Sequence, residues 1–143
     1  MVQLQKLTSD EDAQVLVKVE ALNIVGSIKT RTALAMIEAA EKEGTLHPDS
    51  IIVEHTSGNQ GIGLALIGAV KGYKVKIIMP DSVSIERRKL VEAYGGEVIL
   101  VKDNGDIGKA IEDCLCKADE MAKENPKVFI PQQFENPNNP EVH

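Results

Sequence analysis

The sequence predicts an α/β fold in three layers, with a mostly parallel sheet between two layers of helices. Short β-branched apolar runs alternate with longer amphipathic segments four times along the 143 residues, which is the pattern of successive βαβ units with right-handed crossovers. Hydrophobic residues make up 43% of the chain and charged residues 27%, as in ordinary globular domains. A chain of this length can form one domain with its own core.

The first half of the chain is predicted to begin with strands and continue into a helix. The predicted strands cover residues 2–5, 13–20 and 50–54. The first two flank the acidic turn 8–12, and the third is a β-branched run typical of a buried strand. A helix is expected from Ser27 to Glu43, ended by Gly44. Its apolar positions recur at helical spacing, and they are Ala33, Leu34, Met36, Ile37 and Ala40.

The second half is predicted to repeat the strand–helix alternation. A helix rich in small residues is expected from Gly58 to Gly72. The remaining predicted strands cover residues 74–80, 97–101 and 127–131, and the remaining helices cover residues 84–96 and 106–125. Pro80 should end its strand, and Ser84 is a suitable N-cap for the helix that follows. The Asn- and Pro-rich tail 132–143 is expected to be a loop.

Composition argues against several classes of function. The net charge of −6 disfavours a nucleic-acid or anionic-membrane surface, and the basic run Arg87–Lys89 is better interpreted as the solvated face of a helix. Aromatic residues make up 3% of the chain, with no Trp, so a base-stacking platform is not expected. The apolar stretch Ile62–Val70 is too short to span a bilayer.

The N-terminus and the cysteines predict a cytoplasmic protein. The first twelve residues lack the basic, apolar and small-residue pattern of a signal peptide. Cys114 and Cys116 stand two residues apart in a predicted helix, about 200° apart around its axis. We expect neither a disulfide nor a metal site from them, but two reduced thiols.

Three connections carry unusual polar content, and each follows a predicted strand. They are residues 23–29, 55–61 and 131–136. The carboxyl ends of parallel strands share one edge of a sheet, and open α/β sheets bind ligands along that edge. The three connections are therefore expected to converge in space.

The connection after residue 54 is predicted to bind an anion. Thr56, Ser57 and Asn59 are helix-capping types, and Gly58 lets the backbone approach a ligand. The helix that follows directs free N–H groups and its positive dipole end at this loop. A heavily capped helix packed closely on the sheet is the alternative, and the residues alone leave both open. The glycine spacing fits neither a dinucleotide fingerprint nor a P-loop.

Lys29 is the candidate for amine chemistry. It stands in the first turn of a strongly patterned helix, where the dipole disfavours a cation by about 0.3–1 kcal/mol. An inward-facing amine there should lose its proton more easily, as imine chemistry requires; an outward-pointing surface lysine is the alternative. Arg31 should point elsewhere, in a structural role. Gln132 and Gln133 follow a strand end on opposite faces, so one of them could reach the ligand edge.

Together these segments resemble the pyridoxal-phosphate-dependent β-family, fold type II, in the group of cysteine synthase (O-acetylserine sulfhydrylase) and cystathionine β-synthase. The resemblance rests on four motifs in the family's order and spacing, and they are residues 18–31, 54–65, 79–100 and 131–143. It implies the N-terminal part of such an enzyme over residues 1–143, with residues 72–125 as the movable small-domain part. It also implies a homodimer at full length.

The resemblance implies a role for each matching residue. Lys29 would hold pyridoxal 5′-phosphate as an internal aldimine and then remove the substrate α-proton. Asn59 would hydrogen-bond the 3′-oxygen of the cofactor ring. The pocket for the substrate α-carboxylate would comprise Thr56, Ser57, Gly58, Gln60 and Gln133. The implied chemistry is β-elimination followed by β-replacement on an amino acid, most simply cysteine synthesis from O-acetylserine and sulfide.

The chain departs from the family pattern at several places. Ile24 stands where Pro is usual, Thr30 where Asp is common, and Gln60 where the loop usually has Thr. Gln60 could reshape the pocket, or donate the same hydrogen bond as Thr. The family's phosphate-binding loop and the partner of the pyridine nitrogen lie later in such chains. We therefore expect the 143 residues alone to be incomplete and inactive, with weak cofactor retention.

Other functions stay open at this point. A cystathionine β-synthase-like or other β-substituting activity is the alternative within the family. A non-catalytic module that senses an amino acid or binds a partner, with Lys29 idle, is the alternative from another class. A nucleotide-binding α/β domain is disfavoured by the glycine spacing.

Overall fold

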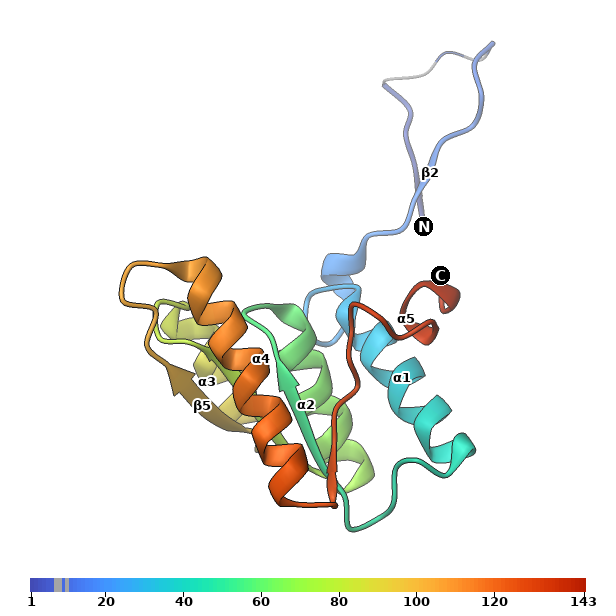
Figure 1. Ribbon diagram of the computed structural model, residues 1–143. Helices are drawn as coiled ribbons and strands as arrows, with labels where there is room; N and C mark the ends of the chain where they lie inside the picture. The colour runs from blue at the N-terminus through green and yellow to red at the C-terminus, as the bar shows by residue number, and fades with distance from the viewer. Residues whose placement is uncertain (7–8, 10) are drawn as a thin grey trace.

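The computed structural model describes residues 1–6, 9 and 11–143. In chain order the elements are β1 (Val2–Gln3), β2 (Leu16–Val17), the 3₁₀ helix η1 (Glu20–Leu22), α1 (Lys29–Glu43), β3 (Ile51–His55), α2 (Asn59–Lys71), β4 (Lys74–Pro80), α3 (Ile85–Ala93), β5 (Glu97–Val101), α4 (Ile107–Glu124), β6 (Val128–Phe129) and α5 (Asn138–Glu141). Figure 1 shows these elements along the chain.

The centre of the fold is a parallel four-stranded sheet in the order β5-β4-β3-β6. Register is continuous along β3 and β4, from Ile51 opposite Lys74 to His55 opposite Ile78. The strands point the same way, so the loops after β3, β4 and β6 leave from one edge of the sheet. The predicted α/β class with a parallel sheet is confirmed.

Helices cover both faces of this sheet, which completes the three predicted layers (Figure 1). On one face, side chains of α1, α2 and α3 form the larger core with Ile52 and Ile77. On the other face α4 buries Cys114 and Ala118 against Val53 and Ile78. Among the described residues no helix has the combined length and apolar character that crossing a bilayer requires.

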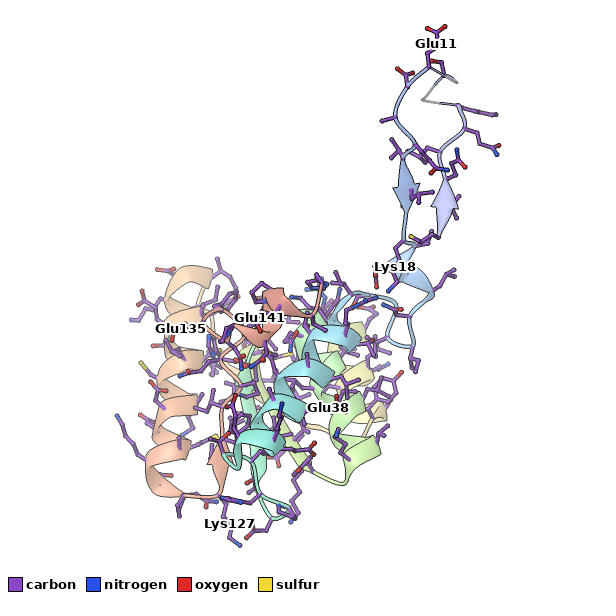
Figure 2. The ribbon with its side chains drawn as sticks, turned by 90° about the vertical axis from the view of Figure 1, so that its right-hand side faces the viewer. Glu11, Lys18, Glu38, Lys127, Glu135 and Glu141 are labelled. Carbon is purple, nitrogen blue, oxygen red and sulfur yellow. The ribbon has the colours of Figure 1, made fainter. Side chains whose placement is uncertain are left out.

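The first two predicted strands lie outside the main sheet. β1 and β2 pair only with each other, antiparallel, with Val2 opposite Val17. This hairpin projects away from the rest of the described chain (Figure 2), and Val2, Leu16 and Val17 are exposed. The prediction that residues 23–29 follow a strand of the parallel sheet is therefore wrong. Part of the predicted turn, Thr8 and Asp10, lies outside the described residues.

Other differences from the predicted elements have local causes. The first helix begins at Lys29 rather than Ser27, because the Ser27 hydroxyl accepts the Lys29 N–H at 3.2 Å from outside the helix. Leu34, one of the apolar positions at helical spacing, is 36% exposed. Ser84 occupies the N-cap position of α3 without a capping side-chain bond. The tail is not entirely loop, since it contains α5 against α1.

Candidate active site

The N-terminus of α2 carries the predicted anion-binding loop. Gly58 is its N-cap, with an extended φ of −130°, and no side chain caps the helix. Thr56 instead accepts the Gly58 N–H through its hydroxyl at 3.2 Å, and the side chain of Asn59 is exposed. A Cβ built on Gly58 would meet nothing within 4 Å. The start of α2 therefore has no side-chain cap, and the space beside Gly58 is open, as an anion site requires.

Lys29 is the first residue of α1, and it is half-buried. The turn before it is shaped by side chains and by one left-handed glycine. Asn23 donates from Nδ2 to the Ser27 carbonyl at 3.0 Å, and Gly26 has a φ of 68°, which favours glycine. These contacts fix the direction in which the chain enters α1, and so the position of Lys29.

An ion pair that the sequence did not indicate anchors the same turn. Glu20 of η1 lies 3.2 Å from Nη2 of Arg31 and 3.3 Å from Nζ of Lys18. It also accepts from the Asn23 amide. The prediction that Arg31 is structural is confirmed. The role of Glu20 was missed because its partner is eleven residues away and no periodic pattern links the two.

The lysine helix and the anion-binding helix approach each other closely at their N-terminal turns. A Cβ built on Gly63 would lie 2.6 Å from the Lys29 carbonyl oxygen and 3.2 Å from the Ala33 Cβ. Only glycine allows this approach, because a methyl group would overlap backbone atoms. The start of α1 is therefore brought to the loop by helix–helix packing, and not by a strand end as predicted.

A small pocket of about 90 Å³ brings together three of the predicted substrate residues, Thr56, Ser57 and Gln133. Gln133 is 7% exposed, and its carbonyl accepts from the Asn139 side chain. Ser57 is held from the other side by Arg87, whose Nη1 donates to the Ser57 carbonyl at 2.9 Å. The predicted convergence of the loops after β3 and β6 is thus present in the structure.

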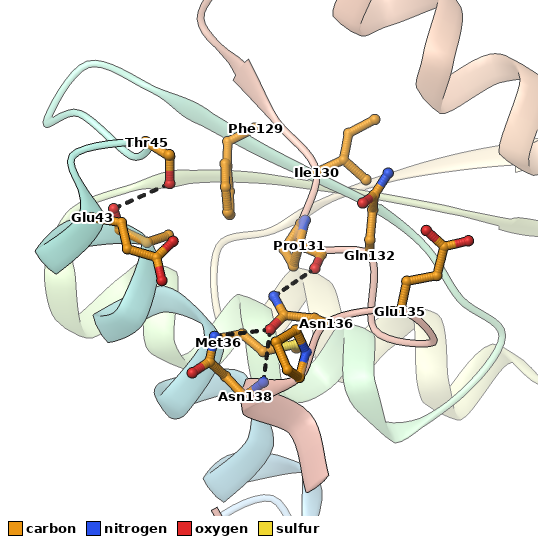
Figure 3. Close-up of a pocket in the computed structure, with 12 residues that line it drawn as sticks. Met36, Glu43, Thr45, Phe129, Ile130, Pro131, Gln132, Glu135, Asn136 and Asn138 are labelled. Carbon is orange, nitrogen blue, oxygen red and sulfur yellow. Dashed lines mark hydrogen bonds between the residues drawn. The ribbon is translucent and has the colours of Figure 1, made fainter. Parts of the chain in front are cut away.

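A larger pocket of about 360 Å³ lies between α1 and the 129–138 segment (Figure 3). Its wall includes Glu43, Gln132, Glu135 and Asn136, and Asn136 donates from Nδ2 to the Pro131 carbonyl at 2.9 Å. None of the predicted site residues lines it. The smaller pocket is therefore the candidate site, because the polar side chains of three predicted substrate residues converge there.

The side chain of Gln60 turns away from this pocket. It is 1% exposed, and its Oε1 accepts from the Thr32 hydroxyl at 2.8 Å inside the α1–α2 interface. The expectation that the Gln60 side chain lies beside the substrate carboxylate is not what the structure shows. Its backbone N–H, in the first turn of α2, remains at the helix end where an anion would bind.

Glu54 is a buried carboxyl that the sequence analysis did not single out. It is fully buried at the end of β3, and its Oε2 accepts the Gln133 N–H at 3.3 Å. Burial raises the pKa of Glu54 to about 7, with backbone N–H groups of Gln133, His55 and Gln132 opposing that rise. Burial likewise lowers the pKa of the neighbouring His55. Glu54 therefore attaches the Gln133 segment to the strand that carries the anion loop.

We expect Glu54 to make stability fall as pH rises. A carboxyl whose folded pKa lies above its unfolded value of 4.5 favours folding fully below pH 4.5, and this contribution disappears as pH rises through about 7. The change is on the order of 3 kcal/mol. Denaturant unfolding at pH 5 and pH 8 should show this loss in the wild type and little of it in Glu54→Gln. The exposed control Glu120→Gln should keep it, and an equal loss in Glu54→Gln would contradict the assignment.

The two cysteines differ in their burial. Cys114 is buried, Cys116 is exposed, and both are free. Burial, then the charge of Asp113, raises the pKa of the Cys114 thiol to about 11, so it is a poor nucleophile. In the part of the chain that the structure describes, no group of three or more His, Cys, Asp or Glu could hold a metal ion.

Comparison with known proteins matches the whole chain to one family. A family model described as "Pyridoxal-phosphate dependent enzyme" matches residues 1–143. A cysteine synthase of Flavobacterium sp. is 53% identical over 134 residues, which is 94% of this chain and 42% of that protein. The chain thus spans less than half the length of this relative.

Solved structures of similar proteins share the fold. A hydrogen sulfide-producing enzyme of Fusobacterium nucleatum is 52% identical with a TM-score of 0.81, covering 91% of this chain and 42% of that chain. A cysteine synthase of Entamoeba histolytica is 38% identical with a TM-score of 0.89, covering 99% of this chain and 42% of that chain.

Proposed function

Because this chain belongs to the family of pyridoxal-phosphate-dependent enzymes, we propose that it is the N-terminal part of a β-replacing enzyme of the cysteine synthase type. The observation that carries the proposal is the packing of the Lys29 turn against the uncapped start of α2. An amine, an exposed amide and free N–H groups are a donor set that suits a carbonyl cofactor and an amino-acid carboxylate.

Lys29 and Asn59 suit the aldehyde and ring-oxygen groups of pyridoxal 5′-phosphate. Lys29 offers a half-buried primary amine, and Asn59 offers an exposed amide one residue after the helix N-cap. These two residues would hold pyridoxal 5′-phosphate. When bound, the cofactor supplies an electron sink that stabilises negative charge at the substrate α-carbon.

The remaining site residues would bind and orient the substrate. Thr56, Ser57 and Gln133 line the small pocket, and Gly58 and Gln60 follow Thr56 and Ser57 in the chain at the N-terminus of α2. A carboxylate held there would be neutralised by N–H groups and by the α2 dipole. Nζ of Lys29, once free, would take the α-proton of the substrate.

Residues 72–125 form the movable part in this proposal. They include α3, and Arg87 of α3 already contacts the Ser57 carbonyl. A carboxylate that draws Ser57 inward would therefore pull on α3 through this bond. Movement of such a segment over a bound substrate would exclude water from the reaction.

Gln133 should matter for substrate affinity more than for the chemical step. A hydrogen bond to a charged group contributes about 1.5–3 kcal/mol, so Gln133→Ala should raise KM for the amino acid roughly 10- to 100-fold with little change in kcat. The matched control is Gln132→Ala, since Gln132 is the adjacent, exposed residue and does not line the small pocket. Equal KM values for the two variants would contradict the assigned role of Gln133.

Two assays on the natural protein that carries this sequence test the proposed activity. We expect it to form cysteine from O-acetylserine and sulfide in the presence of pyridoxal phosphate. The second candidate is release of sulfide from cysteine by β-elimination, which the 52% identity to the Fusobacterium nucleatum enzyme favours. Absence of both activities, with cofactor bound, would favour a non-catalytic amino-acid sensor instead.

The proposal extends to the cellular setting by family resemblance. We place the full-length protein in the cytoplasm, as a homodimer, in amino-acid and cysteine biosynthesis. Light scattering of the natural protein checks the dimer directly, because a monomer would give half the expected mass.

A further inference from the structure

A buried polar pair sits in the otherwise apolar interface between α1 and α2. Thr32 is 0% exposed and Gln60 is 1% exposed, and the Thr32 hydroxyl donates to Gln60 Oε1 at 2.8 Å. Around them the two helices pack through buried apolar side chains, including Ala33, Ile37 and Leu64. This is a side chain–side chain bond between residues 28 positions apart, so it reports the relative placement of two elements.

The pair also touches the backbone of Lys29. The Thr32 hydroxyl lies 3.3 Å from the Lys29 carbonyl oxygen, the atom that a Cβ on Gly63 would approach to 2.6 Å. Gln60 in turn follows Asn59 directly in the first turn of α2. The Thr32–Gln60 bond therefore joins the helix turn that carries Lys29 to the helix turn that carries Asn59.

Stability does not explain why this pair is polar. Among the residues that the structure describes, Gln60 Nε2 is buried with no hydrogen-bond partner, and a buried unpaired donor costs folding free energy. Apolar side chains of similar shape would remove that cost. Buried polar contacts of this kind are known to fix the register between helices at the expense of stability.

We propose that Thr32 and Gln60 are positioning residues whose hydrogen bond sets the register of the lysine helix against the anion-binding helix. The bond places Lys29 and Asn59 so that both reach the same ligand. This inference rests on the proposed function, and it gives Gln60 a role inside the protein rather than in the substrate pocket.

The test is a shape-matched removal of the bond in the natural protein. The double variant Thr32→Val/Gln60→Met keeps the packed volume and removes the unpaired donor, so its unfolding midpoint should equal or exceed that of the wild type. A misplaced catalytic group costs up to about 100-fold, so kcat should fall about 10- to 100-fold. KM should change less, and the absorption maximum of the bound cofactor should shift.

Two matched variants separate positioning from packing. Thr32→Ser keeps the hydroxyl and should retain most of the wild-type kcat. Ile37→Val perturbs the same interface without touching the pair, so it should change stability and leave kcat and the cofactor spectrum unaltered. Should the double variant not fold, Gln60→Met alone replaces it, because Thr32 can still donate to the Lys29 carbonyl.

A folded double variant with wild-type kcat and an unshifted cofactor spectrum would overturn the inference. The proposed function has its own readout in the same experiment, the covalent attachment of cofactor to Lys29. If Lys29 carries no cofactor in the wild type, the proposed function fails. If Lys29 carries it and the double variant behaves as wild type, only the positioning role of Thr32 and Gln60 fails.

Discussion

Replacing Lys29 by alanine is expected to abolish the activity of the natural protein. Lys29 is assigned two tasks, holding the cofactor and taking the substrate α-proton, and loss of general base catalysis alone costs about 10²–10⁴-fold in kcat. The side chain is half-buried at the start of α1, and among the described residues its amine takes part in no ion pair. Its removal should therefore leave the fold intact. Steady-state kinetics and circular dichroism of the purified variant measure both expectations.

Lys42 provides the matched control for this experiment. It lies on the same helix, in the last turn of α1, and it is exposed. Lys42→Ala should keep the wild-type activity. If Lys29→Ala and Lys42→Ala lose activity to the same small extent, the lysine chemistry assigned here is wrong.

Replacing Gly63 by alanine should destabilise the packing of α1 against α2. The added methyl group would lie 2.6 Å from the Lys29 carbonyl oxygen and 3.0 Å from the carbonyl carbon. Both are backbone atoms, so α1 and α2 must separate at their N-terminal turns. Overpacking of this kind costs about 1–3 kcal/mol. The displacement falls on Lys29 itself, so cofactor affinity should fall together with the unfolding free energy.

Gly108→Ala is the matched control for the Gly63 variant. Gly108 is an exposed residue of α4, where an added Cβ would meet only the Asp106 side chain at 3.4 Å. Alanine there should be neutral or stabilise by up to about 1 kcal/mol through helix propensity. Denaturant unfolding and a cofactor titration of both variants check the contrast. A Gly63→Ala protein as stable as Gly108→Ala would mean that the helices are not in such close contact.

Most of the fold could be predicted because periodicity and stop signals are local. The strand 74–80 was predicted with its observed bounds, Lys74–Pro80, and Gly44 ends α1 in the left-handed conformation as expected. The pairing of strands is not local. β2 resembles the other strands in sequence but pairs only with β1. Nothing in its residues shows that it belongs to a projecting hairpin and not to the main sheet.

The candidate site was predicted in its residue types and less well in its geometry. Thr56, Ser57 and Gln133 converge because parallel strands release their loops at one edge. The direction of a long side chain is set by tertiary packing, so the inward turn of Gln60 toward Thr32 could not be read from spacing. Glu54 was missed for the same reason. Its position in β3 does not indicate whether its carboxylate faces solvent or the interior. Only the structure shows that Glu54 is fully buried against Gln133.

The account depends on a covalent bond between the cofactor and one particular amine. The most direct measurement is borohydride reduction of the natural protein with pyridoxal phosphate bound, followed by protease digestion and mass spectrometry of the peptides. We predict a reduced pyridoxyl adduct on the peptide that contains Lys29, and on no other lysine. An adduct located on a different lysine, or none on a protein that binds the cofactor, would contradict the assignment.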